Sequence, residues 1–356
     1  MPETPKTARP PKVTLKDVAH LAGVDRSVVS RIINNDPNLS IRPETRLRVQ
    51  QTIDRLGYRP NAAARSLRTA RAYMFGLLIP DFANPVYAEI ITGAERAAGE
   101  LGYALMTASS AGVRFALPHY LELIGQGRVD GLLFAGEETG HELEQLRASN
   151  IPWVLVNRRT QGSRRYVILD DERAGHIAVD HLVSLGHTRI AHLAGPAGAD
   201  TAHRRRAGYL SAMATAGLAT TPDLISHADY TPAGGATAMD ELLSAPQPPT
   251  AVFVANVASA VGALHAIHER GLSVPRDISV IAVHDMPLAG HLVPALTTVR
   301  MPLEQLGHRA LQLLAQREPT EPITETVTDP VELIVRQSTA PPPKHDNPTV
   351  PQQAGK

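Results

Sequence analysis

The chain has 356 residues, of which 43% are hydrophobic and 20% charged, a balance typical of soluble globular proteins. This length exceeds what one ordinary core needs, so we expect two or three domains. The absence of cysteine excludes a disulfide scaffold and a cysteine-ligated metal site. The N-terminal residues lack the apolar segment of an export signal, and no run is apolar enough to span a bilayer. We therefore expect a cytoplasmic protein.

The charges are unevenly distributed along the chain. Residues 1–71 carry 14 Lys and Arg against 6 Asp and Glu, a net charge of +8, and the remaining 285 residues carry a net charge of −8. A basic head on an acidic body indicates that the head meets a polyanion. A solvated charged surface would give the same split, so both interpretations stay open on charge alone.

The head begins with a Pro-rich arm, residues 1–11, which we expect to be disordered. Two short helices are predicted next: Thr14 is a good N-cap for the first, Gly23 suits a tight turn, and Asp25 caps the second. Apolar residues recur at helical spacing at Leu15, Val18, Ala19, Leu21, Ala22, Val28, Val29, Ile32 and Ile33. This pattern is typical of a helix-turn-helix, whose second helix enters the major groove of DNA.

A third helix is predicted from Pro43 to about Leu56, ended by Gly57. Its inward positions would be Leu47, Val49, Ile53 and Leu56. These elements define an all-α helix-turn-helix domain over residues 12–60. Residues 61–72 are rich in helix formers but too short for a helix that is stable alone. By itself, this segment is either a linker or a helix that folds on a partner.

The body, from Tyr73 on, alternates apolar runs with helix-like stretches. The runs are YMFGLLIP, YALMTA, VDGLLFAG, IPWVLVN, RIAHLAG, TAVFVAN and SVIAV. This alternation predicts an α/β core of parallel, doubly wound sheets. Its length indicates two lobes with a ligand cleft between them, lobe 1 at about 73–168 plus 300–325 and lobe 2 at about 169–299 plus 326–340. The polar tail, 341–356, is expected to be disordered and has no heptad leucines.

Several motifs together resemble one family. VTLKDVAHLAGV, VSRIINN, RPETRLRV, LGYRPNAAARSLRT and FGLLIPDFANP are similar, in this order, to the LacI/GalR family of bacterial transcriptional regulators, over residues 12–340. The turn PNLSIRPET is two residues longer than is usual in that family. The resemblance implies a homodimer on a pseudo-palindromic DNA operator. It also implies a periplasmic-binding-protein-like core for a small-molecule effector, and a hinge helix that folds on the operator.

The resemblance implies three kinds of DNA contact. Bases would be read by Arg26, Ser27 and Arg31, the minor groove would be filled by Asn61, Ala64 and Leu67, and phosphates would be contacted by Thr14, Ser30, Arg65 and Arg68. Arg26 suits a guanine edge, and Leu67 would wedge between base pairs. Arg26 and Ser27 could instead contact only phosphate, as most protein groups on DNA do.

For the effector, the resemblance implies contacts from Asn84, Tyr87, Asn157, Arg205, Tyr230, Asn256, His284 and Asp285. Asn157, Val257 and His284 stand where the family commonly has carboxylates, whereas Asp285 is retained. This favours a cleft for an anionic or modified sugar, or else reflects drift at residues that do not touch the ligand. His284 would be a pH-sensitive contact or ordinary hydrogen-bonded structure. Arg204 and Arg206 are expected to cover a helix surface.

The functional prediction is a ligand-responsive transcriptional regulator, in this family most often a repressor, associated with the nucleoid in the cytoplasm. We expect no enzymatic activity, no catalytic residues, no cofactor and no metal, because no P-loop, GxSxG or zincin motif is found. The alternative is a solute-binding protein of the same bilobed fold without a regulatory role. The sequence leaves the effector, the operator and the sign of the response open.

Overall fold

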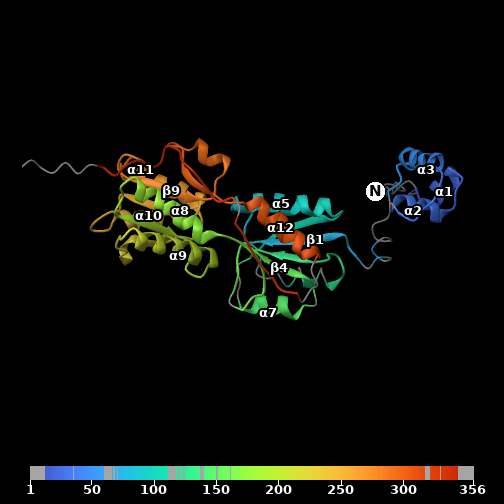
Figure 1. Ribbon diagram of the computed structural model, residues 1–356, viewed down its shortest axis with the longest axis horizontal. Helices are drawn as coiled ribbons and strands as arrows, with labels where there is room; N and C mark the ends of the chain where they lie inside the picture. Colours follow the sequence, from blue (N-terminus) through green and yellow to red (C-terminus); the bar gives the residue numbers. More distant parts are fainter. Residues whose placement is uncertain are drawn as a thin grey trace, which may run out of the picture. The chain divides into compact units, whose positions relative to one another are not determined.

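The structure is a computed structural model that describes residues 13–34, 36–59, 66, 69, 71–110, 118, 121–122, 125–136, 140–149, 151–160, 162–316, 321–328 and 330–343. It divides into two compact units, Met1–Ala72 and Tyr73–Lys356 (Figure 1). Among the residues so described, no helix combines the length and the apolar character needed to cross a membrane.

The first unit holds three short helices, α1 (Leu15–Ala22), α2 (Arg26–Ile33) and α3 (Pro43–Leu56). Thr14 caps α1 in a capping box with Asp17, whose side chain accepts the Thr14 backbone N–H at 2.8 Å. Gly23 and Gly57 end α1 and α3 in the left-handed conformation, with φ of 64° and 58°. The structure thus has the predicted caps and turn at the predicted positions.

Two leucines in this unit lie differently from the prediction. Leu47 is 59% exposed and Leu21 is 47% exposed. Leu47 precedes the buried Val49 by two residues, which turns its side chain about 200° away around α3. The buried face of α3 includes Thr52 instead, whose hydroxyl donates to the carbonyl of Arg48 at 2.8 Å.

The second unit contains two six-stranded sheets, one in each lobe (Figure 1). The sheet of lobe 1 has the order β11-β5-β4-β3-β1-β2 and is parallel throughout. Its strands are β1 (Met74–Ile79), β2 (Ala104–Ser109), β3 (Leu132–Phe134), β4 (Trp153–Val156), β5 (Arg165–Leu169) and β11 (Ile323–Val327). Helices α5 (Val86–Glu100) and α12 (Leu303–Gln316) pack together on one face, and α7 (Gly140–Ala148) packs through Leu146 on the other.

The sheet of lobe 2 repeats this topology with the order β12-β10-β9-β8-β6-β7, and only the edge strand β12 runs antiparallel. Its strands are β6 (Ile190–Ala194), β7 (Ile225–His227), β8 (Ala251–Val254), β9 (Ser279–Val283), β10 (Thr297–Arg300) and β12 (Glu332–Ile334). Two helix pairs cover it: α8 (Asp171–Ser184) with α9 (Asp200–Thr215), and α10 (Pro232–Leu243) with α11 (Val257–Glu269). Short 3-10 turns span Pro222–Leu224 and Pro287–His291. The predicted fold class is confirmed.

All three helix pairs of this unit approach closely through a glycine on each helix. In the α5–α12 pair, a Cβ on Gly93 would lie 1.8 Å from the carbonyl oxygen of Glu304, and one on Gly307 would lie 2.0 Å from that of Ile90. The α8–α9 and α10–α11 pairs repeat the arrangement at Gly175 with Gly208 and at Gly235 with Gly262. The glycines let the backbones meet without side chains between them, which fixes each pair against its sheet.

Candidate functional site

In the first unit, the start of α2 presents two exposed side chains, Arg26 and Ser27. The Asp25 carboxylate accepts the backbone N–H of Ser27 at 2.7 Å and caps the helix. The Ser27 backbone amide is therefore used in folding, whereas the side chains of Arg26 and Ser27 point outward from a helix of fixed register. Such a helix end can present polar groups to base edges or phosphates.

Arg31, predicted to read bases further along α2, is held within its own unit. Its Nε donates to Asp36 at 2.7 Å, and its Nη2 donates to the carbonyl of Asn38 at 3.0 Å. These bonds tie α2 to the loop before α3, the segment that is longer than is usual in the resembled family. In this structure Arg31 therefore helps to shape this loop, and its base contact stays a prediction.

Two residues were predicted to contact phosphates in this unit: Thr14, which is exposed, and Ser30, which is partly buried. The Thr14 hydroxyl donates to Asp17 at 2.7 Å. Five predicted DNA contacts lie outside the described residues: Asn61, Ala64, Arg65, Leu67 and Arg68. Their roles stay predictions.

In the second unit, a cavity of about 220 Å³ lies between the lobes. Its walls follow the carboxyl ends of strands, where open α/β sheets bind ligands: Asp81 follows β1, Asn157 follows β4, Asn256 follows β8 and His284 follows β9. Seven of the eight predicted effector residues line it: Asn84, Tyr87, Asn157, Arg205, Tyr230, Asn256 and His284. Residues that the prediction missed include Arg158, Thr201 and Asp229.

Arg205 is bound on all sides by protein groups. Its Nε donates to Asp171 at 2.7 Å, its Nη1 to the carbonyl of Ala255 at 2.7 Å, and its Nη2 to Nε2 of His284 at 2.8 Å. Asp171 has no exposed surface. Burial alone would raise the pKa of Asp171, but the guanidinium groups of Arg204 and Arg205 together hold it below its ordinary value. The Arg205 charge is therefore compensated by Asp171, so this guanidinium does not by itself favour an anionic ligand.

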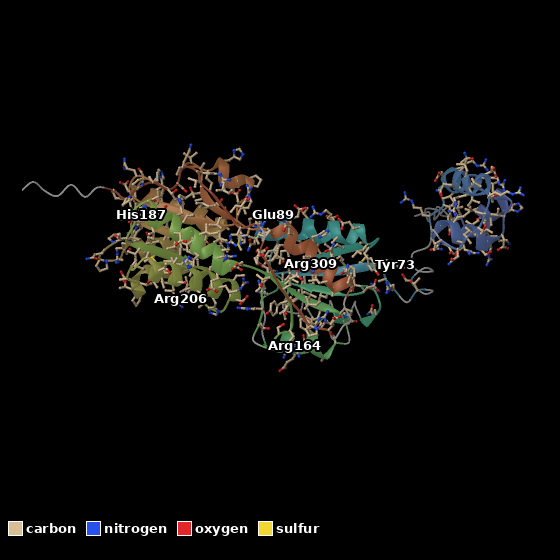
Figure 2. The ribbon with its side chains drawn as sticks, in the orientation of Figure 1. Tyr73, Glu89, Arg164, His187, Arg206 and Arg309 are labelled. Carbon is tan, nitrogen blue, oxygen red and sulfur yellow. The ribbon has the colours of Figure 1, made fainter. Side chains whose placement is uncertain are left out.

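Arg204 is buried, so the prediction that it covers a helix surface is wrong. It forms an ion pair with Asp171, and its Nη1 also donates to the carbonyl of Leu169 at 2.6 Å. Its Nε donates to Asp200 at 2.9 Å, one helical turn earlier. Arg206 does lie on the surface of lobe 2 (Figure 2).

Two of the predicted effector contacts, Asn256 and Tyr230, form hydrogen bonds with other protein groups. The Asn256 side chain caps α11 by accepting the Ser259 N–H at 2.9 Å, and its Nδ2 donates to the carbonyl of Tyr230 at 3.3 Å. The Tyr230 hydroxyl lies 2.9 Å from that of Thr201. Asn256 thus positions Tyr230 at the cavity wall, while Tyr87 accepts a hydrogen bond from Arg158 at 3.1 Å in lobe 1.

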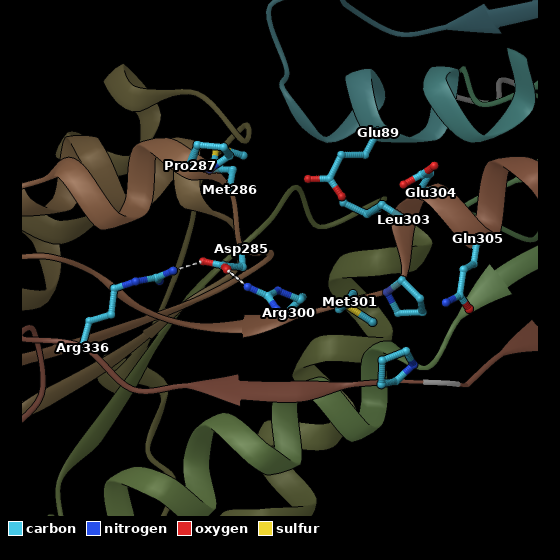
Figure 3. A pocket seen from close by; sticks show the side chains of 12 residues that line it. Glu89, Asp285, Met286, Pro287, Arg300, Met301, Leu303, Glu304, Gln305 and Arg336 are labelled. Atoms are coloured by element: carbon cyan, nitrogen blue, oxygen red, sulfur yellow. Dashed lines mark hydrogen bonds and ion pairs between the residues drawn. The ribbon is translucent and has the colours of Figure 1, made fainter. Parts of the chain in front are cut away.

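Asp285, the eighth predicted residue, lies elsewhere. It lines a separate cavity of about 500 Å³ that also includes Glu89, and it accepts hydrogen bonds from Arg300 and Arg336, each at 2.7 Å (Figure 3). Burial would raise the pKa of Asp285, but hydrogen bonds from Arg300, Thr298 and Arg336 lower it. The two successive residues thus line different cavities, His284 the smaller one and Asp285 the larger one.

His284 is also unsuited to sense pH near neutrality. It is 1% exposed, and burial, with the nearby charge of Arg205, lowers its pKa to about 3. The ring is neutral at physiological pH, so the predicted pH-sensitive contact is not supported.

Comparisons with known proteins agree with this two-part chain. Residues 14–61 match the family described as "Bacterial regulatory proteins, lacI family", and residues 179–339 match "Periplasmic binding protein-like domain". The chain is 38% identical to the ribose operon repressor of Escherichia coli (strain K12) over 307 residues, 85% of this chain and 92% of the relative. It is 34% identical to catabolite control protein A of Priestia megaterium over 331 residues, 92% and 99% of the two chains.

Two solved structures extend the likeness to the fold. The lac repressor dimer bound to operator and the anti-inducer ONPF superposes with a TM-score of 0.80 at 29% identity, covering 93% of this chain and 100% of that one. The complex of the regulator CelR with cellobiose gives a TM-score of 0.70 at 33% identity, covering 92% and 100%.

Proposed function

This chain belongs to the LacI family of bacterial regulatory proteins, and we propose that it is a repressor that binds a pseudo-palindromic operator as a dimer and responds to an uncharged effector. The observation that carries this proposal is the joint presence of a helix-turn-helix and a ligand cavity between two lobes in one chain. Because its operator is DNA, we place the protein in the cytoplasm at the nucleoid.

On DNA, Arg26 and Ser27 contact base edges from the start of α2. Both side chains are exposed, and the Asp25 cap fixes the end of the helix that carries them. Thr14, Ser30, Arg65 and Arg68 contact phosphates, and Leu67, with Asn61 and Ala64, enters the minor groove. A dimer would place two such heads on two half-sites, which requires an inverted repeat.

The effector is uncharged, rich in hydroxyl groups and of monosaccharide size. The cavity wall contains two carboxylates, Asp81 and Asp229, and two guanidinium groups, Arg158 and Arg205, so its formal charges balance. At about 220 Å³ it is smaller than the sites that hold drug-sized ligands. The relatives include a ribose operon repressor and a cellobiose-bound regulator, which agrees with a carbohydrate.

The test is selection of sheared host genomic DNA on the purified full-length protein, followed by sequencing, with and without monosaccharides. We expect fragments that share an inverted repeat. Arg26→Ala should abolish their enrichment, whereas Arg206→Ala, which removes the same charge from the exposed surface of α9, should not. No enrichment with the wild type, alone or in the presence of cell extract, would favour the alternative of a solute-binding protein.

A further inference from the structure

Residues with strained backbones gather at the cavity. Four non-glycine residues in the described part of the chain have positive φ, and three of them line this cavity: Asn157 at 66°, Tyr230 at 65° and His284 at 71°. Side chains other than glycine adopt this conformation at a cost, which persists where function requires a particular direction for the side chain. The positive φ values thus gather at one place in the described chain, the wall of this cavity.

The tautomer of His284 follows from its partner. A guanidinium group can only donate hydrogen bonds, so the Nε2 atom that lies 2.8 Å from Nη2 of Arg205 must be the acceptor. The neutral ring then carries its proton on Nδ1. Burial, with the charge of Arg205, lowers the pKa of the ring to about 3, which agrees with the neutral form.

The Nδ1–H group of His284 has no acceptor among the described residues, although it is buried. On the opposite lobe, the Oδ1 atom of Asn157 is likewise buried without a donor, and Asn157 is only 5% exposed. Unpaired buried polar groups are rare in folded proteins because they lose their bonds to water. The two atoms, a donor on lobe 2 and an acceptor on lobe 1, belong to residues that line the same cavity.

We propose that His284 determines effector specificity, by donating a hydrogen bond from Nδ1 to an oxygen of an uncharged, hydroxyl-bearing ligand whose own hydroxyl donates to Oδ1 of Asn157. The proposal rests on the proposed function only in taking this cavity as the effector site. A hydroxyl-rich ligand suits both positions because each hydroxyl both donates and accepts. An aspartate at position 284 would only accept hydrogen bonds, so the ligand would have to donate there. With histidine, the ligand must present an acceptor instead.

Two variants distinguish a hydrogen bond from His284 to the ligand from the hydrogen bond that His284 accepts from Arg205. In His284→Asn, the amide lies at the level of Nδ1 and keeps a donor there, but the acceptor for Arg205 is lost. In His284→Gln, the amide lies at the level of Nε2, so its oxygen can accept from Arg205 while the Nδ1 donor is lost. Both variants keep a polar side chain, and asparagine also tolerates positive φ.

The probes are D-ribose and D-galactose, each paired with its acid, D-ribonate and D-galactonate, titrated calorimetrically into full-length protein without DNA. We expect at least one neutral sugar to bind and its acid to bind at least tenfold more weakly. His284→Gln should weaken the binding of that sugar about tenfold, the worth of one hydrogen bond, and His284→Asn less than about threefold. A greater loss in His284→Asn, tighter binding of an acid, or no binding of either sugar would overturn the proposal.

A ligand-free measurement tests the tautomer. In protein labelled with ¹⁵N-histidine, the ring signals absent from His284→Gln should show a protonated Nδ1 and a bare Nε2, unchanged between pH 5 and 8. A protonated Nε2 in the wild type would overturn the assignment. Neither experiment contains DNA, so a protein that binds the sugar as described but selects no inverted repeat would refute the regulatory function and leave the role of His284 standing.

Discussion

Replacing Asp171 with asparagine tests the buried charge cluster behind the cavity. The Asp171 side chain has no exposed surface, and its two oxygens each pair with a different guanidinium, Oδ1 with Arg205 at 2.7 Å and Oδ2 with Arg204. Asparagine keeps the size of the side chain but turns one acceptor into a donor that faces a donor. It also leaves two cations without their shared counter-charge, apart from the contact of Arg204 with Asp200.

Removing one partner of a buried ion pair costs about 3–5 kcal/mol, because the remaining charge stays desolvated. We expect Asp171→Asn to lower the free energy of unfolding of the two-lobed unit by that amount. In urea, a loss of this size shifts the unfolding midpoint by about 1–2 M, which circular dichroism measures readily. Glu172→Gln, the exposed neighbour on α8, is the matched control and should change stability by less than about 0.5 kcal/mol. A loss for Asp171→Asn no larger than that of the control would refute the claim that ion pairing holds this cluster.

Two further predictions concern pH and helix packing. Between pH 7 and 5 the free energy of unfolding should fall, because the folded protein keeps His192 and His284 neutral to about pH 3 while the unfolded chain protonates them below its ordinary pKa of 6.5. The expected slope is about 1 kcal/mol per pH unit for each ring, and urea unfolding curves with the same midpoint at both pH values would contradict it. Gly93→Ala should destabilise the second unit by about 1–3 kcal/mol, because its Cβ would overlap the Glu304 carbonyl. Gly99→Ala, in the same helix α5 but with open space around it, should raise the free energy of unfolding by about 0.5–1 kcal/mol. Thermal melts in which Gly99→Ala was the less stable variant would refute the close approach of α5 and α12 at Gly93.

Local patterns predicted the first unit well, because its determinants are local. A capping residue acts within three positions of itself, and a glycine turn within one or two, so Thr14, Gly23, Asp25 and Gly57 could be assigned from the sequence. Six of the seven apolar runs likewise contain strands that are mostly buried, and the seventh contains the edge strand β2, which is only partly buried. The five remaining strands are partly polar or only three to five residues long, as in β7 (Ile225–His227), and are fixed by their neighbours in the sheet.

Other features depend on residues far apart in the chain and could not be predicted. Asp171 meets Arg204 and Arg205 across 33 or 34 positions, so neither its burial nor their neutralisation is visible in the sequence. The direction of Asp285 depends on which side of a strand end faces the other lobe. The glycines of the helix pairs lie inside helices, where helix propensity alone would predict that they destabilise the helix.

The charge cluster also joins the cavity to the contact between the lobes. Arg204 belongs to lobe 2, yet its Nη2 donates to the carbonyl of Asn157 in lobe 1 at 3.3 Å, and its partner Asp200 accepts the backbone N–H of Arg159 at 3.1 Å. Asp171 is the first residue of α8, where the chain first passes from the sheet of lobe 1, after β5, to lobe 2. Because Arg204 and the cavity residue Arg205 share that carboxylate, one buried side chain connects the cavity wall with the contact between the lobes. For a ligand in this cavity to regulate the DNA-binding unit, it must bind one arrangement of the lobes more tightly than another.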